Sequence, residues 1–394
     1  MTMRHSRNST RSGDLRHAAA RPGDALARVA VSAKAVACAA LGLAALLICQ
    51  TGLAQTPAGA AAQAGAAALG SGSGAPGAAE GKPQERNISD WLMRMHEASR
   101  KRAYIGTFVV SSTSSMSSAR IWHVCDGEQQ MERIEALTGA PRSTFRRNDE
   151  VITFHADTKT ALSEKRESIG LFPNLLKAAD SGIAQFYAAK QVGVERVAGF
   201  DADVVQLTPK DNLRFGYRVW SEKKTGLVVK LQTLDIDGRV LEQAAYSELQ
   251  MDAPVSMARL TQMMGSVEGY KVEKPELVKT TALNEGWVLK TPVAGFKPMS
   301  CYKRVVARSD GTPAENAMQW IFSDGLASVS LFAEVFDRQR HLQEGLLASG
   351  ATQSLTRKLA DKTGDKAAEW WLTIVGEVPA GTLTSFAQGL ERKK

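Results

Sequence analysis

The chain has 394 residues, with 49 Lys or Arg, 41 Asp or Glu and a formal net charge of +8. This length suits two folded domains. The positive charge is concentrated at the start: residues 1–54 carry seven basic and two acidic residues, so the remainder holds 42 and 39 and has a net charge of +3. A nearly neutral remainder without a dense Lys/Arg stretch argues against nucleic-acid binding.

The N-terminus has the layout of an export signal. Basic residues precede an uncharged apolar run over 35–49, and the small residues Gly52 and Ala54 then stand where a signal peptidase reads the chain. The run is shorter than the roughly 20 residues that a membrane-spanning helix needs. We therefore predict a signal peptide over 1–54, cleaved after Ala54, and a protein of the periplasm; an uncleaved membrane anchor is the alternative.

Residues 55–87 are rich in Ala, Gly, Ser and Pro and are predicted to form a disordered tether, because they cannot bury enough apolar surface to fold. An N-terminal domain is then predicted over 88–252. It opens with a helix, for which Ser89 is a candidate capping residue. The apolar residues that follow share one helical face: Trp91, Leu92, Met95 and Ala98.

After this helix the apolar residues alternate in twos, which indicates β-strands. Turn signals such as Asp126-Gly127 and Asp237-Gly238 separate the runs by only a few residues, so neighbouring strands are predicted to be antiparallel. Residues 172–189 do not follow this alternation, and we predict that they form helix packed over the sheet. The predicted strands lie near 104–110, 118–125, 128–137, 142–147, 150–156, 190–198, 202–208, 214–222, 227–235 and 239–249.

The segment 253–282 contains Pro254 and Pro275 and shows little alternation, so we predict an interdomain linker with a short helix over 256–265. A C-terminal domain is predicted over 283–394. The fold class is therefore α+β: a large, curled antiparallel sheet with helical cover, and a smaller C-terminal α+β domain. The second domain is predicted to contain strands near 299–307, 317–323, 326–335 and 369–377, and a helix after Pro379.

The sequence offers no constellation for chemistry, so we predict no catalytic, cofactor-binding or metal-binding residues. There is no Gly-x-Ser-x-Gly motif, and the glycine-rich stretch 70–77 follows no strand. The histidines beyond the leader lack the spacing of metal ligands and are more simply explained as packed or solvated side chains: His96, His123, His155 and His341.

Two cysteines lie beyond the leader, Cys125 and Cys301, one in each predicted domain. The periplasm permits a disulfide between them, and a bridge that closes so long a loop could add about 5 kcal/mol in the chain-entropy model. It would also fasten together two domains that the predicted linker would otherwise leave free to move. We therefore predict two free, mostly buried thiols.

Several motifs occur in the order typical of one known family: Trp91-Leu92-Met93-Arg94-Met95, Tyr104-Ile105-Gly106-Thr107-Phe108, Arg196-Val197-Ala198-Gly199, Pro209-Lys210-Asp211, Arg214-Phe215-Gly216-Tyr217-Arg218-Val219-Trp220, Thr225-Gly226-Leu227, Phe322-Ser323-Asp324-Gly325-Leu326-Ala327-Ser328-Val329-Ser330 and Val375-Gly376-Glu377-Val378-Pro379. These stretches span about 91–390 and cover both predicted domains. On these motifs the chain resembles the MucB/RseB regulators of the sigma-E envelope-stress pathway. The long basic leader and the Ala/Gly tether depart from the family pattern.

The resemblance implies a fold and a role. The N-terminal domain should resemble the lipoprotein carriers LolA and LolB, an unclosed antiparallel half-barrel around an apolar cavity. Both domains should grip the periplasmic domain of a membrane-bound anti-sigma factor and shield it from the protease that starts its destruction. Lipid-like signals, such as lipopolysaccharide or stalled lipoproteins, should release that grip, and a homo-oligomer is an open alternative for the assembly.

Two sets of residues are candidates for these contacts, and each also has a purely structural interpretation. Aromatic residues of the N-terminal domain are candidates for the lipid cavity, although aromatics on a sheet more often form plain core: Phe108, Trp122, Phe154, Phe186 and Tyr187. A second set forms the candidate partner surface, although turns and interdomain packing would also explain it: Lys210, Arg214, Asp324, Trp370 and Trp371.

Two other functions remain open from the sequence. A periplasmic lipid or lipoprotein carrier would share the cavity but would not need the second domain. An envelope hydrolase would need a polar cluster in a cleft, built from residues that are distant in the sequence. Capture of an anti-sigma factor, of a lipidated cargo or of neither from an envelope extract would separate the three functions.

Overall fold

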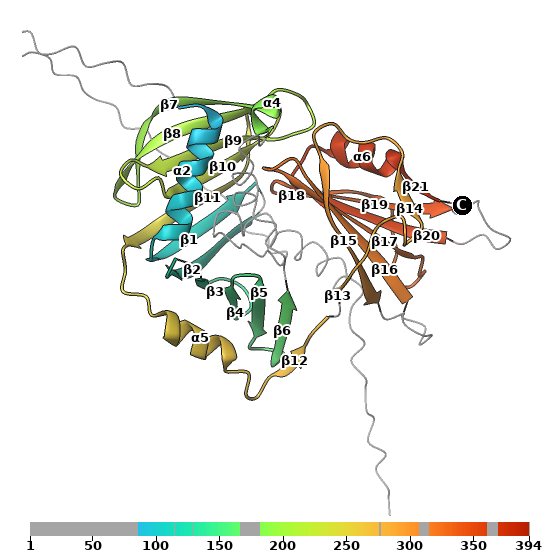
Figure 1. Ribbon diagram of the computed structural model, residues 1–394, viewed down its shortest axis with the longest axis horizontal. Coiled ribbons are helices and arrows are strands. Elements are labelled where there is room, and N and C mark those ends of the chain that lie inside the picture. Colours follow the sequence, from blue (N-terminus) through green and yellow to red (C-terminus); the bar gives the residue numbers. More distant parts are fainter. Residues whose placement is uncertain are drawn as a thin grey trace, which may run out of the picture.

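The computed structural model of the chain describes residues 86–393, apart from 114, 128, 166–181, 276, 307–314 and 361–368. It contains a 12-stranded sheet, a seven-stranded sheet and a short two-stranded pair. In Figure 1 the larger sheet, coloured from blue to yellow, lies beside the smaller one, coloured orange to red. We call the larger sheet with its helices the first domain, and the smaller sheet with its helix and the short pair the second domain.

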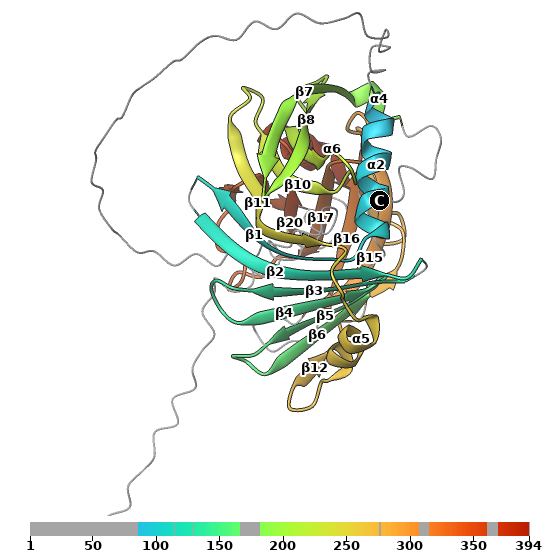
Figure 2. The ribbon, with the colours of Figure 1, turned by 90° about the vertical axis from the view of Figure 1, so that its left-hand side faces the viewer.

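The larger sheet confirms the predicted fold class. Its strands run in the order β12-β6-β5-β4-β3-β2-β1-β11-β10-β9-β8-β7, and all neighbours are antiparallel except β12 with β6. The sheet curls without closing, so β12 and β7 remain edges (Figure 2). The strands are β1 Tyr104–Ser112, β2 Ser115–Cys125, β3 Gln130–Ala136, β4 Arg142–Arg147, β5 Glu150–His155, β6 Thr160–Lys165, β7 Tyr187–Val197, β8 Phe200–Pro209, β9 Gly216–Glu222, β10 Val228–Leu234, β11 Val240–Met251 and β12 Lys271–Glu273.

Strand β1 shows how the alternating sequence produces this sheet. Tyr104, Gly106, Phe108 and Val110 are buried, and the residues between them are half-buried. Gly106 is required because the ring of Tyr246, on the neighbouring strand β11, occupies the space where a side chain would lie; a Cβ at residue 106 would come within 2.5 Å of Tyr246 Cε1. The same tyrosine ring meets Phe108 edge-on at a centroid distance of 6.1 Å.

Helix α2 (Ile88–Lys101) lies across the sheet in Figures 1 and 2 and buries the apolar face predicted from the sequence. Its cap differs from the prediction. Asn87 caps the helix, because its side chain accepts from the Asp90 backbone N–H at 3.0 Å while the Asp90 carboxylate accepts from the Asn87 N–H at 3.2 Å. Ser89 lies inside the first turn. The Arg94 guanidinium then fastens the helix to the β9–β10 turn by donating to the carbonyl of Glu222 at 3.2 Å.

The segment predicted as a linker is more structured than expected. Its helix α5 (Met257–Gly265) begins at the Ser256 cap, close to the predicted 256–265, and packs Leu260 and Met264 against strands β3–β6. Strand β12 then adds a parallel edge to the first sheet, and β13 (Leu277–Lys279) pairs with β15 of the second sheet. The segment therefore contributes elements to both domains.

Of the helical cover predicted over 172–189, the residues up to 181 lie outside the described part of the chain. The next residues form a single helical turn, α4 (Ile183–Phe186), and Tyr187 already belongs to strand β7. The helical prediction was therefore wrong for the residues after Phe186, where the chain returns to the edge of the sheet.

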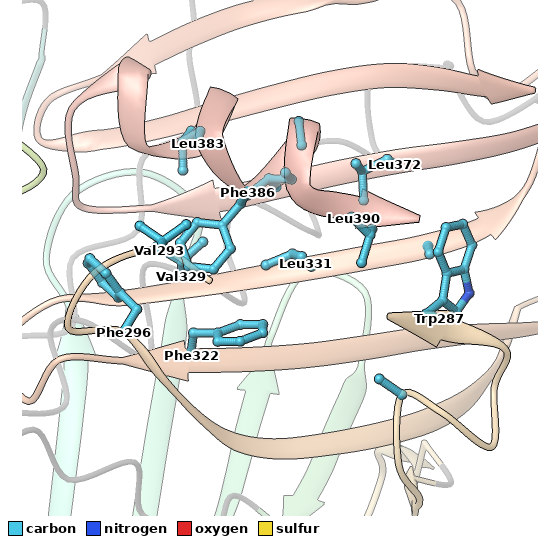
Figure 3. Packing of buried hydrophobic residues seen from close by; sticks show 14 of the residues in the cluster. Trp287, Val293, Phe296, Phe322, Val329, Leu331, Leu372, Leu383, Phe386 and Leu390 are labelled. Atoms are coloured by element: carbon cyan, nitrogen blue, oxygen red, sulfur yellow. The ribbon is translucent and has the colours of Figure 1, made fainter. Parts of the chain in front are cut away.

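The second sheet has the strand order β13-β15-β16-β17-β20-β19-β18. Helix α6 (Ala380–Gly389) lies over one face of it, next to the β14–β21 pair. Figure 3 shows Phe386 of α6 directed toward Phe322 of the sheet, with Leu383 and Leu390 beside it. The elements of this domain beyond β13 are β14 Trp287–Leu289, β15 Lys297–Val306, β16 Glu315–Ser323, β17 Ser328–Val335, β18 Gly345–Ser349, β19 Thr352–Ala360, β20 Glu369–Gly376, α6 and β21 Leu390–Arg392.

The predicted signal peptide over 1–54 and most of the tether over 55–87 lie outside the described residues. Within the described ranges, no helix combines the length and the apolar character needed to cross a membrane. Cys125 lies half-buried on β2 and Cys301 lies buried on β15, so the two thiols belong to different sheets, and both are free.

Candidate functional site: the contact between the two domains

The structure does not bring the five candidate cavity aromatics together. Phe108 lies with Tyr104 and Tyr246 in one apolar cluster, on the same face of the sheet as Ala119, its partner on β2. Trp122 is an odd number of residues from Ala119 and therefore points to the opposite face, which α5 covers.

The remaining aromatics of that set divide in the same way. Phe154 lies under α5 with Trp122, whereas Tyr187 and the half-buried Phe186 pack in a third cluster beneath α2. Phe154 and Tyr187 are less than 10% exposed. The five residues therefore belong to three packed clusters and do not line one cavity.

The two tryptophans proposed for the partner surface point to opposite faces of β20, as the alternation predicts. Trp370 packs with the second-domain core and meets Trp287 edge-on at 5.3 Å. Trp371 is only 4% exposed and stacks on the His341 ring at a centroid distance of 4.8 Å. Neither indole is exposed: Trp371 is covered by the His341 ring, and Trp370 is half-buried against the second-domain core.

The face of the sheet that carries Trp371 also holds a buried charged group. His341 Nε2 lies 3.2 Å from a carboxylate oxygen of Glu334, which also pairs with Arg340. Burial acts to raise the pKa of Glu334, but the hydrogen bond from His341 and the charge of Arg340 outweigh it, so this pKa lies below its ordinary value. The sequence analysis missed this cluster, because Glu334, Arg340 and His341 follow no spacing that marks an ion pair in a strand and the turn after it.

The remaining candidates meet at the boundary between the domains. Arg214, in the loop between β8 and β9, is fully buried. Its Nε donates to the Asp324 carboxylate at 2.5 Å, its Nη1 to Asp211 at 2.5 Å and its Nη2 to the carbonyl of Ala294 at 2.7 Å. The prediction that Arg214 and Asp324 form an open partner surface was therefore wrong: each residue is buried against the other.

Two aromatic rings hold the guanidinium of Arg214 from the sides. The ring centroid of Phe186, from the first domain, lies 4.3 Å from the guanidinium carbon, and that of Phe296, from the second, lies 4.8 Å away. A planar guanidinium stacks on aromatic faces while its edge donates hydrogen bonds. Gly295 has a φ of +81° and adjoins this sandwich, where a Cβ would come within 2.7 Å of the Phe186 ring.

Asp324 lies in the turn between β16 and β17. Its second carboxylate oxygen accepts from the backbone N–H groups of Leu326 at 2.8 Å and Ala327 at 2.7 Å. Burial raises the pKa of Asp324, and the Arg214 charge and these two amides oppose that effect. The carboxylate is thus held by its own turn on one side and by Arg214 of the other domain on the opposite side.

Apolar side chains are exchanged across the same boundary. Leu326, from the β16–β17 turn, packs into the first-domain cluster that contains Trp91 and Leu92 of α2. In return, Leu213 of the first domain packs against the second-domain core, and its carbonyl accepts from the Thr382 hydroxyl at 2.8 Å. These leucines were missed because each lies in a turn, where no periodic pattern marks it as buried.

Lys210 is exposed, unlike the other residues of the candidate partner surface. Its Nζ donates to the carbonyl of Ala184 in α4 at 2.6 Å. Its role on a partner surface stays a prediction. For metal binding, no cluster of three or more His, Cys, Asp or Glu side chains suited to an ion occurs among the described residues.

Comparison with known proteins agrees with this two-domain arrangement. The sequence profile of the MucB/RseB N-terminal domain matches residues 87–264, and that of the MucB/RseB C-terminal domain matches 281–391. The sigma factor AlgU regulatory protein MucB of Pseudomonas aeruginosa is 30% identical over 314 residues, which is 77% of this chain and 90% of that protein. The sigma-E factor regulatory protein RseB of Escherichia coli K12 is 23% identical over 303 residues, 76% of this chain and 89% of that protein.

Solved structures of relatives share both domains. The Pseudomonas aeruginosa MucA/MucB complex contains a chain with a TM-score of 0.60 and 27% identity, covering 78% of this chain and 99% of that one. A MucB in complex with MucA(peri) gives a TM-score of 0.57 and 26% identity over the same shares. With both profiles matched in order and a 30% identical relative aligned over most of its length, the chain belongs to the MucB/RseB family.

Proposed function

We propose that this chain is a periplasmic negative regulator of sigma-E activity. It binds the periplasmic domain of a membrane-bound anti-sigma factor and shields that domain from proteolysis. The observation that carries the proposal is the match to MucB chains solved with MucA, one of them with MucA(peri), because that match extends over both domains and 99% of those chains.

The proposed role is binding without catalysis. It is supported by how several buried or half-buried ionisable groups are used: Arg214 and Asp324 contact each other across the domain boundary, and Glu334 contacts His341 within the second domain. Charges that are neutralised in this way position structural elements and do not face a substrate. The sequence relatives are likewise named as regulatory proteins.

The partner is tested directly by titrating the purified protein with the periplasmic domain of the anti-sigma factor from the same organism, followed by calorimetry. We expect a saturable complex and slower cleavage of the anti-sigma domain by its protease. A folded protein that gives neither binding heat nor protection at tens of micromolar would contradict the proposal. Lipidated cargo captured instead from an envelope extract would favour the carrier function.

We further propose that a lipid-like ligand, such as lipopolysaccharide or a stalled lipoprotein, lowers the affinity for this partner. The unclosed sheet supports a site on the face opposite α5, where the neighbouring strands β3–β6 carry half-buried apolar residues such as Ile134 and Leu162. Each CH₂ that such a face buries contributes about 0.8 kcal/mol. A ligand of this kind can shift partner affinity only by its differential affinity for the two states.

The lipid proposal is tested by repeating the titration with an acylated ligand present. We expect partner affinity to fall by a factor of about 5–150, the usual range of coupling between two sites. The partner must weaken lipid binding by the same factor. An unchanged dissociation constant with lipid demonstrably bound would contradict sensing and favour a carrier site. The oligomeric state is measured in the same samples by light scattering, where a partner-independent dimer would support self-association.

A further inference from the structure

The contact around Arg214 differs from ordinary interdomain packing in how its charges are shared. Two of the three groups that Arg214 donates to, Asp324 and the Ala294 carbonyl, belong to the second domain, and the third, Asp211, belongs to the first. We propose that Arg214 and Asp324 form a latch that fixes the orientation of the two domains and that opens and closes as a unit. This proposal does not depend on the identity of the partner.

The local hydrogen bonds make such a latch reversible. When the domains separate, Arg214 retains Asp211, and Asp324 retains the two amides of its own turn. Neither charge is then left without a counter-charge or donor, which is the situation that makes breaking an ordinary buried ion pair so costly. Each of the two charged groups therefore keeps a hydrogen-bond partner within its own domain when the domains separate.

The contacts of Arg214 also constrain the relative orientation of the two domains. The guanidinium donates to three acceptors and lies against the rings of Phe186 and Phe296, so the contact constrains both Asp324 and the loop that carries Ala294 and Phe296. The apolar part of the contact exchanges Leu326 for Leu213, one side chain in each direction. The domains also meet at the β18–β19 turn, where Gly350 lies beside Glu242 and Ser112 of the first domain.

The opposite end of the boundary provides a hinge. The chain leaves the first sheet at Glu273, the end of β12, and enters the second at Leu277, the start of β13, with Pro275 between them. In Figure 1 the passage from β12 to β13 lies at the lower side of the molecule and α4 at its top. A rotation about the passage therefore separates the latch residues with the least disturbance of either sheet.

Helix α4 connects the first domain to the Arg214–Asp324 latch. Its last residue, Phe186, stacks on Arg214, and its Phe186 carbonyl accepts from the backbone N–H of Lys210 at 2.8 Å. The Lys210 side chain donates back to the Ala184 carbonyl. A displacement of α4 is therefore transmitted to the loop that carries Arg214, so the state of the first domain can control the latch.

The test measures domain orientation by single-molecule energy transfer. Dyes are placed on the purified protein at two exposed positions, one in each domain, through Asp149→Cys and Gln388→Cys in a Cys125→Ser, Cys301→Ala background. The wild-type latch should give one narrow high-transfer population. Asp324→Asn retains the shape of the turn and its amide contacts but removes the charge that Arg214 needs, so we expect the low-transfer population to rise at least tenfold.

Asp211→Asn is the matched control, since it removes the other carboxylate on Arg214, the one that does not cross the boundary. It should leave the high-transfer population dominant. Leu326→Ala tests the apolar part of the contact independently of charge and should also raise the low-transfer population. This variant still tests the proposal if Asp324→Asn fails to fold. A folded Asp324→Asn or Leu326→Ala protein with the wild-type distribution would overturn the latch, as would an equal opening in Asp211→Asn.

Discussion

The two domains organise their cores differently. In the first domain the buried apolar residues form three separate clusters, one inside the curl of the sheet, one beneath α2 and α4, and one beneath α5. In the second domain the described residues form one continuous cluster between the sheet, α6 and the β14–β21 pair (Figure 3). This cluster joins most elements of the second domain, although β13, β18 and the face of the sheet that carries Trp371 lie outside it. Separate clusters, in contrast, allow one part of a sheet to loosen while another remains intact.

This difference suits a division of labour between the domains. Local opening is governed by how many buried contacts a region shares with the rest of the protein. The strands β3–β6 depend on α5, a nine-residue helix that follows the main strands in sequence. The second sheet is also covered by a short helix, α6, but that helix packs into the same cluster as β15, β16, β17 and β20, so we expect the second domain to be the more rigid of the two.

The largest expected effect comes from the second-domain core. Phe386 is fully buried and meets the rings of Phe322 at 5.0 Å and Phe296 at 5.7 Å. Phe386→Ala should lower the free energy of unfolding by about 3–5 kcal/mol, because it leaves a cavity that three elements share. Chemical denaturation followed by fluorescence measures this loss. The half-buried Phe200 of the first domain is the control, and an equal loss in Phe200→Ala would contradict the difference between the cores.

A smaller and more local effect is expected under α5. Leu260→Ala removes a buried side chain of this helix and should cost about 2–5 kcal/mol of local stability. Hydrogen exchange should then accelerate in β3–β6 and remain unchanged in the second domain. Gln262→Ala, at an exposed position of the same helix, is the control. Acceleration spread evenly over both domains would show that the clusters of the first domain are not separable.

The Glu334 cluster gives a pH-dependent test within the rigid domain. Because the pKa of Glu334 is lower in the folded protein than its ordinary value of 4.5, its contribution is present above that value and is lost as the pH falls through the folded pKa. Glu334→Gln should therefore cost about 1.5–3 kcal/mol at neutral pH. Its stability should converge with that of the wild type in acid. Glu344→Gln, at an exposed site, should show no such pH dependence.

The two thiols report on the domains with the least disturbance. Burial raises the pKa of Cys301 to about 11, so very little thiolate is present at pH 8, and it lies within the single core. Cys125 is half-buried in the first domain. Alkylation of the native protein should label Cys125 at least tenfold faster, and the denatured, unreduced protein should label both. Labelling that requires a reductant would show that the thiols are bridged.

The sequence predicts most of the main strands because apolar residues at every second position mark the buried face of each strand. The predicted strands over 142–147 and 150–156 match β4 and β5 closely. The unpredicted strands lack that pattern. Strand β6 has a single buried residue, β18 is exposed along nearly its whole length, and in β19 the residues Leu355 and Leu359 are four apart, a helical spacing. Strands β12, β13, β14 and β21 have three residues each, too few for any period.

The sequence identified two residues of the contact at Arg214 but did not predict that they contact each other. Arg214 and Asp324 were both singled out, but as an open surface, because an arginine near a turn is usually solvated. Their burial depends on each finding the other across 110 residues of sequence, and on Asp211, Phe186 and Phe296 closing around them. Such an arrangement is a property of the tertiary fold, which a local pattern does not contain.

The β14–β21 pair has a consequence for the order in which the protein matures. Trp287, at the start of the second domain, is opposite Arg392, whose guanidinium lies 5.0 Å from its ring, so the pair cannot form until the last strand has emerged. At synthesis rates of about 5–20 residues per second, roughly 6–24 seconds separate the completion of β12 from that of β21. If the first domain folds before β21 is available, Leu213 faces water and Arg214 is held only by Asp211 until the second domain closes over them.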